Sequence, residues 1–225
     1  MRLISSADGR RRIWYRADEI ERVCARALLG AGLWPEGPQS DVDIEALVEN
    51  HLGALVDYGV DLPAEVLGYT EFGATRKIAV NRALTDAATR DDSTGAAIGR
   101  WRATIAHEAA HVLLHAQLFD RSVGTPGHPN ERPIRCPRRS LEAPEPRYDW
   151  REVQANMGMA SLLMPRELFD REATTAFEVR GRYIPPVSAN IAWVESVVTV
   201  LAGRFSVSRQ AARIRLAVLG YTDGA

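Results

Sequence analysis

Apolar residues near the N-terminus recur at the spacing of amphipathic helices. Over residues 17–29 they fall three or four positions apart, and Gly30 follows as a helix-ending residue. A second helix is expected after Asp41, whose carboxylate can cap it, because apolar residues return at Ile44, Leu47 and Val48. The pattern therefore predicts two N-terminal helices.

The pattern changes character over residues 54–81. Apolar and polar residues alternate from Val66 to Thr70, Gly73 interrupts the run, and apolar residues resume over 78–80. Alternation with a period of two is typical of half-buried strands. We expect a small antiparallel sheet here.

The last forty residues read as two helices joined by a short turn. They cover 188–205 and 208–219, and Ser206 or Ser208 can cap the second helix. Basic residues after Ser208 give this segment a likeness to a helix-turn-helix recognition helix. The same segment is largely apolar, which favours packing onto a core or docking to a partner over DNA contact.

The strongest chemical signal is the string His107-Glu108-Ala109-Ala110-His111. It lies in a run with apolar residues at helical spacing, so the two imidazoles fall one turn apart on one helix face and can bind one ion. Glu108 lies about 100° further round, where it can reach a metal-bound water without ligating the metal. This geometry is typical of zinc hydrolases, although a purely structural histidine pair is the alternative.

A catalytic zinc site needs a third protein ligand and an open fourth position. Glu152 is the best candidate, because it lies on a second predicted helix together with Asn156, which can accept a hydrogen bond from the free ring nitrogen of a histidine ligand. Asp149 is the main rival. Spacing alone does not reject other carboxylates either, namely Glu131, Glu142, Glu145 and Asp170.

These strings together resemble the ImmA/IrrE family of metallopeptidases. The likeness is carried by residues 103–115, by 150–156 and by the Leu-Leu-Met-Pro phrase at 162–165, and it extends over roughly residues 40–220. It departs from the family at Met157-Gly158-Met159 and in a long spacer between His111 and Glu152. The resemblance implies metal ligation by His107, His111 and Glu152 and a general-base role for Glu108. It also implies a protein substrate, a helix-turn-helix transcriptional repressor whose cleavage derepresses genes.

The ligand set by itself predicts peptide-bond hydrolysis. Glu108 would take a proton from water and then hand it to the leaving amine. A donor is also needed for the oxyanion of the tetrahedral intermediate, and the sequence offers Tyr148, Tyr183, His115 and Arg151. His115, one turn after His111, better fits a group at the helix surface or one that contacts a ligand.

The spacer of residues 117–149 is polar and rich in proline, which excludes a regular helix. Because it joins the two ligand-bearing helices, we interpret it either as a lid or substrate-selection loop or as plain disorder. Cys136 lies within it, and a thiolate there could occupy the open metal position as a switch; a free, inert cysteine is the alternative.

Composition narrows the function classes. The net charge of −1 argues against a generally phosphate-seeking surface, even though 27 of the 28 basic residues are arginine. The two cysteines form no disulfide framework, and no stretch is long and apolar enough for a membrane span. A cytoplasmic location is expected.

The sequence thus predicts an α+β protein: a mostly helical zinc-metallopeptidase core with a small antiparallel sheet and a C-terminal helical pair. The expected division is an N-terminal helical extension over 1–40, a core over 41–187, and a helix-turn-helix-like segment over 188–225 packed on that core. The predicted function is a Zn²⁺-dependent endopeptidase. The alternative is a DNA- or protein-binding regulator whose metal site is structural or vestigial.

Overall fold

The computed structural model describes residues 2–5, 11–36, 40–73, 75–119, 134–137, 149–178, 186–189 and 192–223. Its N-terminal part is an antiparallel hairpin of β1 (Arg2–Ser5) and β2 (Arg11–Trp14), followed by helix α1 (Ala17–Gly30). The carboxylate of Glu19 accepts a hydrogen bond from the backbone N–H of Arg16 and so closes the first turn of α1. The apolar face of this helix is buried, as its spacing predicts.

The second predicted helix is short and changes its winding. Helix α2 (Ile44–Ala46) continues directly as a π-helical turn, η1 (Leu47–His51). Its cap is Asp43, whose carboxylate accepts from the backbone N–H of Ala46, so the prediction that Asp41 caps it is wrong. Asp43 directly precedes the first helical residue, which is where a capping side chain can reach the free N–H groups.

The sheet has four strands in the order β3-β5-β4-β6. They are β3 (Leu55–Val60), β4 (Val66–Glu71), β5 (Lys77–Asn81) and β6 (Ile134–Pro137). The expectation of a wholly antiparallel sheet is wrong, since β3 and β5 run parallel while the other pairs are antiparallel. Although β4 follows β3 in the chain, β5 lies between the two, parallel to β3 and antiparallel to β4.

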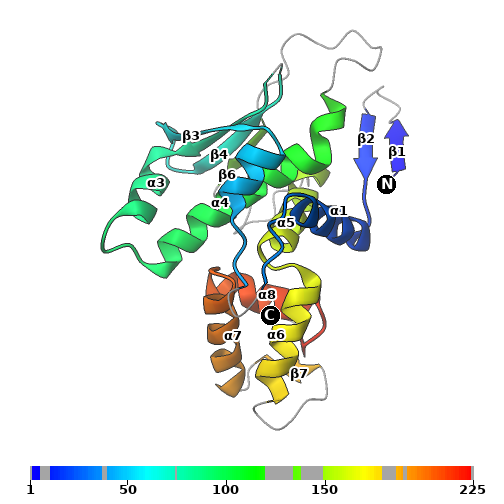
Figure 1. Ribbon diagram of the computed structural model, residues 1–225, viewed down its shortest axis with the longest axis vertical. Coiled ribbons are helices and arrows are strands. Elements are labelled where there is room, and N and C mark those ends of the chain that lie inside the picture. The colour runs from blue at the N-terminus through cyan, green and yellow to red at the C-terminus, as the bar shows by residue number, and fades with distance from the viewer. Residues whose placement is uncertain are drawn as a thin grey trace.

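Helix α4 (Gly95–His115) runs along one face of this sheet and follows the short helix α3 (Arg82–Thr89) (Figure 1). Thr94 caps α4, and a 3-10 turn, η2 (Ala116–Leu118), extends its end. Strand β4 approaches α4 closely at Gly68, where a Cβ atom would lie 2.9 Å from the Cγ2 atom of Thr104. Only glycine at this position lets the strand come so near the helix.

Helix α5 (Trp150–Leu163) packs between α4 and α1 (Figure 1). Asp149 caps it by accepting from the backbone N–H of Arg151. The contact with α4 is tightest at Gly158, where a Cβ atom would lie only 2.6 Å from the Cβ atom of Ala110. The small residues at 110 and 158 therefore set the distance between the two helices that carry the predicted ligands.

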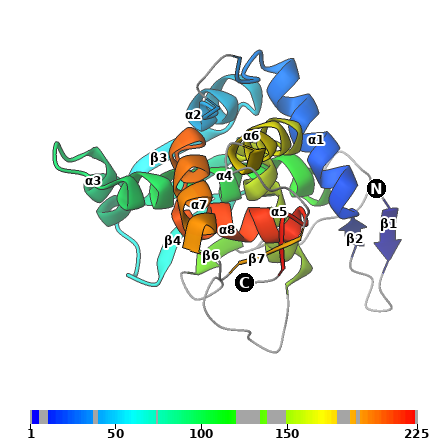
Figure 2. The ribbon, with the colours of Figure 1, turned by 90° about the horizontal axis from the view of Figure 1, so that it is seen from below.

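The C-terminal part consists of α6 (Arg166–Glu178), α7 (Ala192–Arg204) and α8 (Arg209–Val218), with a small parallel pair of β7 (Val187–Ser188) and β8 (Thr222–Asp223). Figure 2 shows these three helices from below, packed beneath α4 and α5. Ser188 lies in β7 rather than at the start of a helix. Ser208 caps α8 by accepting from Ala211, while Ser206 sits in the turn with a positive φ of 50°.

Buried apolar side chains form one continuous core from Ile13 in β2 to Tyr221 ahead of β8. The α+β class with a C-terminal helical pair is confirmed. The division at residues 40 and 187 stays a prediction. Among the described helices, none has both the length and the apolar character to cross a membrane.

Candidate metal centre

Two histidines of α4 present their ring nitrogens to one point. The Nε2 atoms of His107 and His111 lie 3.1 Å apart, and both side chains are buried. One helical turn separates the residues, so their side chains stack on one face as the sequence predicts. This face of α4 points at α5 rather than at the sheet.

Glu152, in the first turn of α5, completes the cluster. Its carboxylate oxygens lie 3.1 Å from the Nε2 atom of His107 and 3.3 Å from that of His111. Burial alone would raise the pKa of Glu152, but the two histidine rings beside its oxygens outweigh burial and lower it to about 2. The group is therefore a carboxylate, the form in which it can ligate a metal.

The donor set fits a metal ion. One ligand atom from each of His107, His111 and Glu152 lies within 4.8 Å of the others, and no other such group occurs among the residues that the structure describes. Two imidazoles and one carboxylate are the protein ligands of many catalytic zinc sites, which keep a fourth position for water. The ring of His107 is fixed from behind by Asn156, whose Oδ1 atom lies 3.0 Å from its Nδ1 atom, as predicted.

Glu108 lies next to this cluster without joining it. Its side chain is fully buried, and one carboxylate oxygen accepts a hydrogen bond of 2.7 Å from the hydroxyl of Thr70 on β4. The other oxygen, Oε1, is buried and has no hydrogen-bond partner among the described residues. Burial raises the pKa of Glu108, because a charge is costly to hold away from water.

His115 does not lie where a substrate oxyanion could reach it. The side chain is fully buried, and both ring nitrogens are engaged, Nδ1 with His111 and Nε2 with Gln154, each at 3.1 Å. Its ring also meets the ring of Trp150 edge to face. Burial lowers the pKa of His115 to about 3, so the imidazole is neutral at physiological pH.

The rival carboxylates lie elsewhere where they are described. Asp149 caps α5 and pairs with the guanidinium of Arg151 at 2.9 Å, and Asp170 accepts from the hydroxyl of Tyr221. The remaining candidates fall outside the described residues, namely Glu131, Glu142, Glu145, Tyr148 and Tyr183. Nothing described therefore competes with Glu152.

The spacer of residues 117–149 is described only at its ends and over β6. The backbone of Cys136 pairs with Gly68 and that of Ile134 pairs with Thr70, so β6 runs along β4, the strand that contacts Glu108. The side chain of Cys136 lies outside the described part, and its role as a switch stays a prediction.

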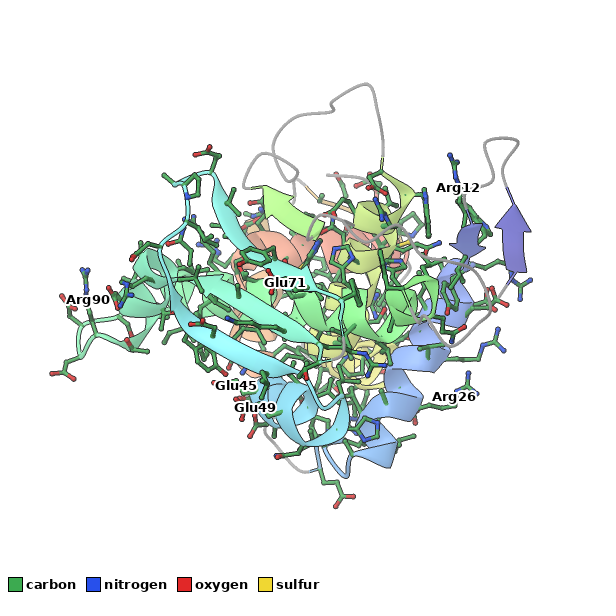
Figure 3. The ribbon with its side chains drawn as sticks, turned by 90° about the horizontal axis from the view of Figure 1, so that it is seen from above. Arg12, Arg26, Glu45, Glu49, Glu71 and Arg90 are labelled. Atoms are coloured by element: carbon green, nitrogen blue, oxygen red, sulfur yellow. The ribbon has the colours of Figure 1, made fainter. Side chains whose placement is uncertain are left out.

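Thr70 and Gln154 are two contributors that the sequence analysis did not single out. Alternation in β4 places Thr70 on the inward face of that strand, but no pattern in the sequence links it to Glu108, 38 positions away. Gln154 is a polar residue on the buried side of a helix, two positions after Glu152. Figure 3, viewed from above, shows the sheet over α4, with Glu71 marking the residue after Thr70.

Comparison with models of protein families adds the decisive finding. Residues 97–217, more than half of the chain, match the IrrE N-terminal-like domain of peptidase family M78. The chain belongs to this family. Comparison with curated proteins gives no match.

As an M78 metallopeptidase, the chain carries the histidine pair, the glutamate between them and the third ligand, Glu152, inside the matched segment. The match begins within α4, so α1 and strands β3, β4 and β5 of the sheet lie ahead of it. The M78 site nevertheless depends on that N-terminal part, because Thr70 comes from β4 and Gln154 donates to the backbone carbonyl of Ile13 in β2. Both segments are therefore part of the functional unit.

Proposed function

We propose that this M78 peptidase is a zinc-dependent endopeptidase that acts in the cytoplasm on a specific protein. The substrate class we propose is a helix-turn-helix transcriptional repressor, whose cleavage derepresses genes. The observation that carries the proposal is a buried carboxylate oxygen of Glu108, which no described residue hydrogen-bonds and which lies beside the convergent donors of His107, His111 and Glu152. A buried oxygen without a hydrogen-bond donor is costly, and a water on a metal at the cluster would supply that donor.

Zinc is the metal that best suits two imidazoles and one carboxylate. When bound, it would lower the pKa of a coordinated water to about 7 and polarise the carbonyl of the scissile peptide bond. The chain itself contributes the rigid geometry. Asn156 fixes the ring of His107, and the glycine contact between α4 and α5 holds Glu152 against both histidines.

Glu108 is the residue that we propose to move protons. The hydroxyl of Thr70 holds one of its oxygens, and the other has no hydrogen-bond partner among the described residues and is free to accept from a water. A raised pKa makes the carboxylate a better base than an exposed glutamate, so it can take a proton from water and pass it to the leaving amine.

The C-terminal arginines support packing rather than DNA binding. Arg209 and Arg213 both pair with Glu195 at 2.6 Å, and Arg204 pairs with Glu172. Arg215 is buried and bonded to Glu21 of α1. All four contact a carboxylate, and the three carboxylates Glu195, Glu172 and Glu21 offset most of the charge that phosphate contact would need. These contacts favour a peptidase with a protein substrate over a DNA-binding regulator with a vestigial metal site.

The test compares four proteins for zinc content and for cleavage of purified helix-turn-helix repressors. Wild type should hold stoichiometric zinc and cleave, Glu152→Ala should hold little zinc, and Glu108→Gln should hold full zinc without cleaving. Asp149→Asn is the matched control, because it removes a charge next to the site but keeps a capping side chain, and it should behave as wild type. Full zinc in Glu152→Ala, or cleavage by Glu108→Gln, would contradict the proposal.

A further inference from the structure

A chain of buried polar groups leads from His111 away from the cluster and ends at the backbone of β2. The Nδ1 atom of His111 lies 3.1 Å from Nδ1 of His115, whose Nε2 atom lies 3.1 Å from Oε1 of Gln154. The Nε2 atom of Gln154 donates to the carbonyl oxygen of Ile13 at 3.2 Å. The side chains of these four residues are at most 3% exposed, so water does not offer them other partners.

The direction of each hydrogen bond follows from the last one. A backbone carbonyl can only accept, so the amide nitrogen of Gln154 must face Ile13 and the amide oxygen must face His115. An amide oxygen can only accept, so His115 must carry its proton on Nε2. A neutral imidazole that donates from one nitrogen accepts at the other, and Nδ1 of His115 therefore accepts from Nδ1–H of His111. The Nε2 atom of His111 is then left with a bare lone pair facing the cluster.

We propose that Gln154 and His115 are positioning residues that fix the tautomer of His111 in the metal-binding form. The inference deepens the proposed function and rests on it. The opposite tautomer would place a proton on Nε2 of His111, between the nitrogen and any ion held with Glu152. The chain thus selects the ligand form of His111 before metal arrives.

The two histidines of the cluster are held in different ways. His107 contacts an amide oxygen directly, that of Asn156. His111 contacts an amide oxygen only through a second imidazole, whose ring is held edge to face by Trp150 at a centroid distance of 5.4 Å. The longer route ties the ligand to β2, so the N-terminal hairpin takes part in ordering the metal centre.

The first test observes the tautomers in wild type and needs no variant. Long-range ¹H–¹⁵N correlation spectra distinguish an imidazole protonated at Nδ1 from one protonated at Nε2. In the metal-free protein at neutral pH, His111 should be protonated at Nδ1 and His115 at Nε2. Protonation of His115 at Nδ1, or of His111 at Nε2, would overturn the proposal.

The second test measures zinc affinity by chelator competition and the visible absorption of the cobalt-substituted protein. His115→Phe keeps the ring but removes the acceptor, and Gln154→Leu removes the group that orients His115. Both should bind zinc roughly ten- to a hundredfold more weakly and give an altered cobalt spectrum. His115→Asn, whose Oδ1 atom can accept from His111, should recover most of the affinity.

Ser161→Ala is the control on α5, because its buried hydroxyl bonds only the backbone of its own helix among the described contacts. It should bind zinc as wild type does. Wild-type affinity in both His115→Phe and Gln154→Leu would overturn the positioning roles while leaving the peptidase proposal intact. A wild-type protein that binds neither zinc nor cobalt would instead overturn both.

Discussion

The contact between Gly158 and Ala110 gives a direct way to loosen the site without touching a ligand. In Gly158→Ala the new methyl carbon would lie 2.6 Å from the Cβ atom of Ala110 and 3.3 Å from the Cδ1 atom of Leu114. Carbon atoms in contact settle at about 3.5–4.0 Å, so α5 must move away from α4 by about 1 Å. Side-chain rotation cannot relieve this contact, because the Cβ atoms at positions 158 and 110 are both fixed to the backbone.

This movement of α5 should affect the free energy of unfolding less than the affinity for zinc. Replacing glycine by alanine within a helix gains about 0.5–1 kcal/mol, while overpacking costs about 1–3 kcal/mol, so the free energy of unfolding should fall by no more than about 2.5 kcal/mol. Metal ligation tolerates displacements of only about 0.2 Å, so moving Glu152 away from His107 and His111 should weaken zinc binding at least roughly tenfold. The loss of affinity should therefore exceed what the loss of stability suggests.

The assay combines urea unfolding of the metal-free protein with zinc competition against a chelator. Gly203→Ala in α7 is the control, because its new methyl group would have no described atom within 4 Å apart from its chain neighbours and the backbone of its own helix. It should raise the free energy of unfolding by roughly 0.5–1 kcal/mol and leave zinc binding unchanged. Wild-type zinc affinity in Gly158→Ala would refute the reasoning, since the helices would then accommodate the methyl group without displacing Glu152.

Three further predictions concern charge and the spacer. In the metal-free protein, Glu108→Gln should raise the free energy of unfolding at neutral pH by about 1–3 kcal/mol, because the folded chain no longer buries that charge. Burial raises the pKa of Glu108, so this gain in the free energy of unfolding should shrink as the pH falls towards 4.5, the ordinary pKa of a glutamate. If urea unfolding gave the same gain at every pH, the reasoning would be contradicted. Replacing residues 120–148 by a short flexible linker should leave zinc affinity unchanged, since the donors come from α4 and α5. Weaker zinc binding in a chelator competition assay would instead place a ligand in the spacer. Arg215→Met should lower the free energy of unfolding by about 3 kcal/mol, with partial recovery on adding Glu21→Gln; an undiminished loss in the double variant would show that the ion pair is not the cause.

The elements that could be predicted are those with a strong local signal. The helix that bears His107 and His111 follows from apolar spacing and motif together, and the choice of Glu152 and Asn156 follows from a four-residue spacing on one face. The residue that caps α2 is Asp43, two positions after the predicted Asp41, and the prediction failed because aspartate is an acceptable capping residue at both positions. The parallel pairing of β3 and β5 is not local: it depends on which strand the chain inserts between the others.

The contacts that could not be predicted link segments far apart in the chain. Thr70 reaches Glu108 across 38 positions, and Gln154 reaches Ile13 across 141. No periodicity encodes such distances, because they arise only when α4 packs on the sheet at Gly68 and on α5 at Gly158. His115 illustrates the same limit, since its one-turn spacing from His111 is visible in the sequence, whereas its burial and its contact with Gln154 are not.

The most direct test of the central claim is the zinc K-edge absorption spectrum of the zinc-loaded protein. A metal held by His107, His111 and Glu152 should show only nitrogen and oxygen neighbours, at about 2.0–2.2 Å, with the multiple-scattering pattern of two imidazoles that a Glu152→Ala sample loses. A sulfur neighbour at about 2.3 Å would place Cys136 on the metal, and a wild-type spectrum without imidazole scattering would show that the metal does not sit on α4.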